Sequence, residues 1–161
     1  MLTIRFDGSA TERYLDALGK KLSNPETLLK SIGEDVMQST RERFKTATTP
    51  DGRAWAPNSP VTLARFAARW GGKKGAQRAG QKTPLIGESR QLSRTINWQL
   101  LRPGAVAVGS PMVYSGVQQF GADKASRGRG PWGAIPARPF LGLSEADKTH
   151  ILALVQRFLL E

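Results

Sequence analysis

The acidic side chains and the single histidine are the residues of this sequence whose types suit acid–base catalysis. The acids come close together at Glu34-Asp35 and at Glu145 with Asp147, and the histidine is His150. Catalysis of this kind needs a carboxylate pair or an imidazole held beside a reacting group, and metal catalysis needs clustered ligands. Both acid pairs fall in predicted helices, where charge pairing or capping explains them, and His150 is predicted to lie solvated or packed on a helix. The sequence therefore predicts no enzyme, no metal site and no cofactor.

Nucleophilic and phosphate-binding motifs are also weak. Cysteine is absent, which removes thiolate nucleophiles, disulfides and Cys-based zinc sites. Gly128-Arg129-Gly130 lacks the preceding strand and following helix that would aim its N–H groups at a phosphate. We therefore expect stability to come from packing or from self-association.

Positive charge is the strongest chemical feature of the sequence. The formal net charge is +11, and residues 53–102 hold ten Lys and Arg against one acid, Glu88. Such a segment attracts either a polyanion or an acidic protein surface, and charge alone does not separate the two. Trp70 lies among the cations, where it either stacks on a base or completes the apolar face of its helix. The residues predicted to contact such a partner are Arg65, Arg69, Lys73, Lys74, Arg78, Lys82, Arg127 and Arg129.

Length and hydropathy indicate one domain, 1–161, because 161 residues suit a single core. No stretch approaches the roughly 20 consecutive apolar residues of a membrane helix. Residues 1–7 lack the basic flank and apolar block of an export signal. We expect a protein that is neither exported nor bound to a membrane.

Helical periodicity is clearest after Asn24-Pro25, a pair typical of a helix start. There Leu28, Ile32 and Val36 recur every four residues, which predicts a long helix over 25–45. Other apolar stripes and capping residues predict helices over 10–22, 59–70 and 114–121, a helical turn near residue 88, and a final helix from 144 onward.

Alternating or proline-restricted residues predict four strands, at 2–6, 95–101, 105–109 and 138–143. The second and third form a hairpin across Arg102-Pro103-Gly104. The Gly-rich basic segments 71–83 and 122–133 are predicted to be flexible loops, because they offer little apolar surface to offset the entropy of ordering. The expected fold is α+β, a small antiparallel sheet packed by the 25–45 helix and the C-terminal helix.

Three passages carry a recognisable order of motifs. The first is Phe44 followed by PDGRAWAP at 50–57, and the second is LIGESRQLSRTI at 85–96. The third comprises VAVG at 106–109, Tyr114, QQFG at 118–121 and IPARPFLGL at 135–143. Together they resemble the phage virion morphogenesis family, the tail completion proteins of Mu-like and P2-like bacteriophages, over roughly residues 25–160.

The resemblance implies a structural virion protein that acts late in assembly, at the head-proximal end of the tail or in the neck joining head and tail. Such proteins usually form rings, commonly six-fold, so the implied partners are further copies and neighbouring tail-tube or neck proteins. An acidic protein neighbour is slightly favoured over packaged DNA for the basic segment, because aromatic residues are sparse there. The alternative function is a basic nucleic-acid-binding module. The predicted framework or interface anchors are Trp55, Phe120, Arg138 and Phe140.

Overall fold

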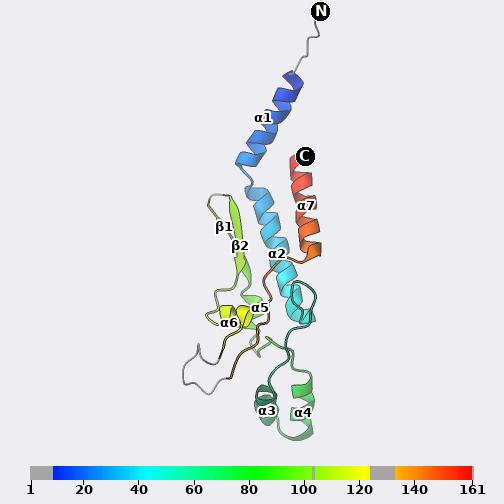
Figure 1. Ribbon diagram of the computed structural model, residues 1–161, viewed down its shortest axis with the longest axis vertical. Coiled ribbons are helices and arrows are strands. Elements are labelled where there is room, and N and C mark those ends of the chain that lie inside the picture. The colour runs from blue at the N-terminus through cyan, green and yellow to red at the C-terminus, as the bar shows by residue number, and fades with distance from the viewer. Residues whose placement is uncertain (1–8, 103, 124–132, 161) are drawn as a thin grey trace, which may run out of the picture.

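A long central helix, flanked by a β-hairpin and a C-terminal helix, organises an elongated molecule (Figure 1). The structure is a computed structural model and describes residues 9–102, 104–123 and 133–160. The strand predicted at 2–6, most of the loop predicted at 122–133, and Arg127 and Arg129 lie outside the described residues. The helices are α1 (Ser9–Ser23), α2 (Glu26–Thr46), α3 (Pro60–Ala68), α4 (Gly72–Gly80), α5 (Gln91–Arg94), α6 (Ser115–Phe120) and α7 (Glu145–Leu160), and the strands are β1 (Asn97–Leu101) and β2 (Ala105–Gly109).

Helix α2 lies between the β-hairpin and α7 (Figure 1). It follows Pro25 and ends at Ala47, whose φ of 56° is left-handed. Gly33 allows the hairpin to approach closely, because a Cβ at this position would lie 2.9 Å from the Trp98 ring and from Val106. The helix therefore carries the contacts that hold both of its neighbours in place.

The sheet is smaller than the sequence indicates. Within the described residues it has two antiparallel strands, β1 and β2, paired from Asn97 with Gly109 to Leu101 with Ala105. The predicted fourth strand, 138–143, forms no strand within the described residues. The Gln118 carbonyl accepts from the Arg138 N–H, and the Gln119 side chain bonds the backbone of Phe140 and Leu141. The α+β class and the packing of the small sheet by the long helix are confirmed.

The prediction of a flexible loop at 71–83 is wrong, because most of this segment forms α4. Lys, Gln, Arg and Ala supply helix propensity there. The left-handed Gly71, with φ of 64°, reverses the chain so that α4 packs against α3. Gly75 is the close contact, since a Cβ on it would overlap the carbonyl oxygen of Ala67. Packing of α4 on α3, which local composition does not reveal, offsets the entropy of ordering.

Gly75→Ala is expected to loosen this pair of helices by about 1–3 kcal/mol, because the new methyl group meets backbone. Hydrogen exchange of the amides of α3 and α4 should become faster. Gly80→Ala is the matched control in the same helix. Its Cβ would meet open space, so that variant should be unchanged or more stable by up to about 1 kcal/mol. Equal exchange in the two variants would contradict the close packing.

The buried core is aromatic at its centre. Phe44 lies 5.3 Å from Trp55, edge to face, and 5.3 Å from Phe140, measured between ring centroids. Met37, Leu92 and Ile96 complete the cluster of buried hydrophobic residues. Neither α1 nor α7 contains a buried residue. The core thus joins α2, the Trp55 loop, α5 and the 138–143 segment, and leaves much apolar surface for other contacts.

Candidate functional site

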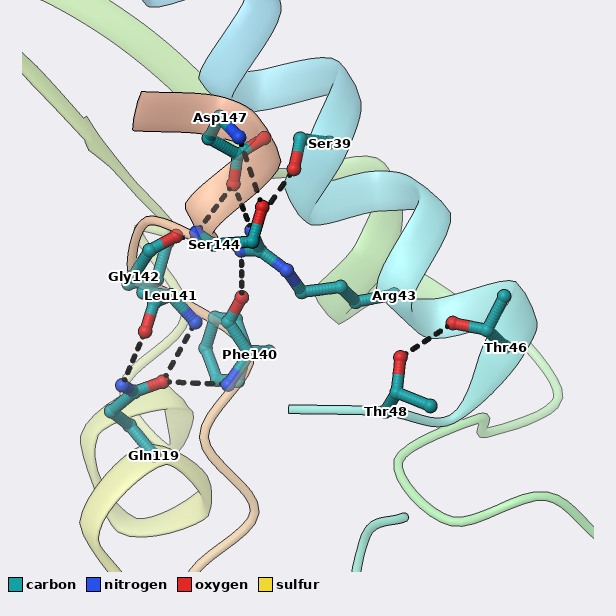
Figure 2. Close-up of polar contacts among 10 residues, drawn as sticks. All are labelled: Ser39, Arg43, Thr46, Thr48, Gln119, Phe140, Leu141, Gly142, Ser144 and Asp147. Atoms are coloured by element: carbon teal, nitrogen blue, oxygen red, sulfur yellow. Dashed lines mark hydrogen bonds and ion pairs between the residues drawn. The ribbon is translucent and has the colours of Figure 1, made fainter. Parts of the chain in front are cut away.

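Side chains from three other parts of the chain fix the extended segment 138–143. The Gln119 amide oxygen accepts hydrogen bonds from the N–H groups of Phe140 and Leu141, both at 3.0 Å, and its amide nitrogen donates to the Leu141 carbonyl at 3.0 Å (Figure 2). The Trp55 indole donates to the Pro139 carbonyl at 2.8 Å. Gln119 therefore bonds to this backbone as a neighbouring strand would.

Arg43 ties α2 to the same segment and to the start of α7. Its guanidinium donates to the carbonyls of Phe140 at 3.1 Å and Gly142 at 2.8 Å, and forms a 2.5 Å ion pair with Asp147 (Figure 2). Asp147 also caps its helix, accepting from the Ser144 N–H at 2.8 Å. Arg43 is buried, so this ion pair belongs to the framework.

Asp147 ionises more readily than an ordinary aspartate. Burial tends to raise its pKa, but the Ser144 backbone hydrogen bond, side-chain hydrogen bonds from Ser39 and Ser144, and the Arg43 charge together lower the pKa below 3.8. The carboxylate is therefore charged throughout the neutral range.

Arg138 closes the Trp55 loop. Its side chain is buried and donates to the carbonyls of Ala56 and Pro57, both at 2.7 Å. Burial lowers the pKa of this guanidinium below its usual value. Of the four predicted anchors, the structure buries Trp55, Arg138 and Phe140 and leaves Phe120 82% exposed. Phe120 is thus the one available to a partner.

The predicted basic cluster comes together on α3, α4 and the turn after them. We call residues 60–82 the basic arm; it lies at the end of the molecule opposite α1 (Figure 1). Its sequence contains six Lys and Arg and no acid. Arg78 stacks over the half-exposed Trp70 ring, 3.7 Å from the centroid. Lys82 turns inward, donating to the Ile86 carbonyl at 2.9 Å and lying over Phe66.

Glu88 lies just outside the arm and is the ion-pair partner of Arg69, a contact that the sequence does not indicate. Its carboxylate forms a 2.6 Å ion pair with Arg69 beside a cavity of about 470 Å³, which Arg65 and Lys82 also line. Gln119 and Arg43 were missed as well, and Asp147 was predicted as a capping residue but not as the ion-pair partner of Arg43. No local pattern marks these long-range contacts, since Arg43 and Phe140 are 97 positions apart.

A larger cavity of about 790 Å³ lies between the arm and the body. It is lined mainly by backbone turns and apolar side chains, with Pro57, Ile86, Tyr114 and Pro136 among them. Arg138, the buried cation at its wall, is already bonded to two carbonyls. This cavity offers shape and apolar surface instead of reactive groups.

The two close acid pairs, Glu34 with Asp35 and Glu145 with Asp147, and His150 have structural partners. Glu34 accepts a hydrogen bond from the Trp98 indole at 2.9 Å, and Asp35 lies 3.1 Å from the His150 imidazole. Glu145 pairs with Lys148 at 2.6 Å. Within the described part of the chain, no three His, Asp or Glu side chains gather in a way that could hold a metal ion.

The structure thus combines a helical framework that has an aromatic core with a basic arm at one end. The chain belongs to the phage virion morphogenesis family, whose model matches residues 6–160. Family membership gives it a role in the assembly of bacteriophage virions and associates it with the virion.

One curated relative is the Mu-like prophage FluMu G protein 2 of Haemophilus influenzae. It is 40% identical over 78 residues, which are 48% of this chain and 53% of the relative. The chain thus spans about half the length of that relative. No solved structure matches the chain.

None of the helices that the structure describes is both long enough and apolar enough to cross a membrane.

Proposed function

We propose that this chain is a non-catalytic ring subunit that completes the phage tail at its head-proximal end or joins head and tail in the neck. Further copies, six in a ring by the family resemblance, would be its first partners, and neighbouring tail-tube or neck proteins its second. Its mechanism is geometric, because subunits associate around an axis and present a common surface to the next ring.

Two separate exposed apolar faces are the observation that carries this proposal. On α1, Tyr14, Leu15 and Leu22 are exposed although they share one stripe of the helix. Around α6, Val113 is fully exposed and Phe120 nearly so. Large apolar patches on a soluble protein mark interaction sites.

The placement of these faces suits a head-to-tail contact. Helix α1 extends beyond the body at one end, whereas α6 lies in the other half of the molecule (Figure 1). A head-to-tail interface joins two different surfaces, and it closes into a ring when the rotation between subunits allows closure. Two unlike apolar faces per subunit are what such a ring requires.

The structural partners of the acids support a non-catalytic role. Glu34 and Asp35, the pair that would serve a nuclease-like enzyme, are bonded to Trp98 and His150. Sustained metal-dependent cleavage of DNA by purified protein, abolished by replacing Glu34 or Asp35, would contradict it.

Removing the apolar stripe of α1 tests the assembly. The variant Leu15→Gln with Leu22→Gln should lose ring-sized species in light scattering and ring images in electron microscopy, because the stripe no longer buries apolar area. The control Arg13→Gln with Lys20→Gln places the same amide side chains on the opposite face of the same helix, and should assemble as the wild type does. Glutamine has helix propensity similar to that of the residues replaced.

A wild-type chain that stays monomeric at every concentration would contradict spontaneous ring formation. Equal loss of assembly in both variants would show that α1 does not act through its apolar stripe.

A further inference from the structure

The basic arm carries more positive charge than its own fold uses. Residues 60–82 contain six cations and no acid, and Arg69 forms an ion pair with Glu88, the one acid of residues 53–102. We propose that the arm binds the phosphate backbone of duplex DNA without reading its sequence.

The donors are grouped on one helix. Lys73 and Lys74 are exposed at the start of α4, and Lys74 and Arg78 lie one turn apart, on the same side of the helix. Stacking on Trp70 limits the rotamers of Arg78, so less entropy is lost when its N–H groups bind an anion. The arrangement presents several cations to one extended polyanion.

The Arg69–Glu88 pair indicates that this surface already holds an anionic oxygen. The carboxylate lies beside the 470 Å³ cavity that Arg65, Arg69 and Lys82 line. Both partners are 64% exposed, and ion pairs of this kind contribute at most about 1 kcal/mol. A phosphate can therefore displace Glu88 from Arg69 at little cost.

The separation of charged and apolar surfaces favours DNA over an acidic protein. The core of a protein–protein interface is depleted of charge and rich in aromatic and aliphatic residues. In the arm, Val61 and Trp70 are the large hydrophobic residues that are exposed, whereas α1 and the α6 region expose several each. Protein contacts thus suit those two faces, and phosphate contacts suit the arm.

The salt dependence of binding to a short mixed-sequence duplex tests the proposal. Each phosphate contact that is lost lowers the slope of log affinity against log salt by about 1. Lys73→Ala with Lys74→Ala should therefore weaken binding and reduce the slope by about 2. The matched control is Lys20→Ala with Lys21→Ala, the other Lys-Lys pair on a helix, which should leave the slope unchanged.

A second variant is expected to strengthen DNA binding instead of weakening it. Glu88→Gln frees Arg69 and should strengthen binding and raise the slope by about 1. Glu42→Gln makes the same charge change at another exposed ion pair, with Lys45 on α2, and should have little effect.

Three results would overturn the proposal: no duplex binding by the wild type at low salt, equal effects of the two double-lysine variants, or stronger binding to polyglutamate than to DNA. The last would identify an acidic protein surface as the partner.

The proposal does not rest on ring formation, because one subunit carries the whole arm. Loss of assembly in the α1 variant should leave the salt slope of isolated subunits intact, so the two failures are distinguishable.

Discussion

Arg43→Ala is expected to lower the free energy of unfolding by about 3–5 kcal/mol, because it breaks a buried ion pair and leaves Asp147 without its cation. The change also removes the donors to the carbonyls of Phe140 and Gly142. Urea denaturation followed by circular dichroism measures the loss. Since Arg43 joins α2 to both the 138–143 segment and α7, a single substitution affects three elements.

The matched control for Arg43 is Arg53→Ala. Arg53 also pairs with an aspartate, Asp51 at 2.6 Å, but its side chain is 80% exposed. Exposed pairs contribute at most about 1 kcal/mol, so this control should stay close to the wild type. If the two variants lost equal stability, the buried pair would not be part of the framework.

Acid should erase the contribution of this ion pair. The pKa of Asp147 is lowered in the folded protein, so its stabilisation is fully present above the unfolded pKa of about 3.8 and is lost as pH falls through the lower folded value. Asp147→Asn should have a lower free energy of unfolding than the wild type. This difference should be constant near neutral pH and shrink below about pH 4.

Asp51 titrates in the same acidic range, and the difference measurement removes its effect. A hydrogen bond from Thr49 is the largest cause of the lowered pKa of Asp51. Burial opposes it, and the hydrogen bond and charge of Arg53 lower the pKa further. Both proteins compared contain Asp51, so its titration cancels. If the difference in unfolding free energy between Asp147→Asn and the wild type persisted unchanged at low pH, Asp147 would not be the group whose charge stabilises the fold.

Gln119→Ala should cost about 3 kcal/mol, because three hydrogen bonds are lost at about 1 kcal/mol each. The N–H groups of Phe140 and Leu141 would lose their acceptor, and the extended segment would lose its substitute for a neighbouring strand. Thermal or urea unfolding measures the effect, and hydrogen exchange of the Phe140 and Leu141 amides localises it.

The neighbouring residue provides the control for Gln119. Gln118 is the same residue type on the same helix and lines the 790 Å³ cavity, and it bonds the segment through its backbone carbonyl, which the substitution keeps. Gln118→Ala should therefore cost well under 1 kcal/mol. A larger loss for Gln118→Ala than for Gln119→Ala would contradict the role given to Gln119.

Except for α4, the helices could be predicted from the sequence because their signals are local. The four-residue spacing of Leu28, Ile32 and Val36 predicted a helix over 25–45, and the structure has α2 at Glu26–Thr46. Likewise Ser144 with Asp147 indicated the start of α7, where the Ser144 side chain accepts from the Asp147 N–H at 3.1 Å. The β-hairpin was predicted from alternation and its turn residues.

The order of motifs also predicted the family correctly. QQFG followed by IPARPFLGL was the most distinctive passage, and the structure shows that these two segments meet through Gln119. The sequence showed that the motifs belong together, but not which side chain joins them.

Contacts between distant residues were decided by the tertiary structure alone. Whether 138–143 pairs as a strand or is bound by side chains depends on Gln119, Trp55 and Arg43, the last almost a hundred positions away. Composition made 71–83 look flexible, yet the approach of Gly75 to Ala67 allows it to fold as α4. Sequence determined the local conformations and the excess of positive charge. Only the folded chain decided which cations are paired and which remain exposed, because pairing depends on distances in space that spacing along the chain does not fix.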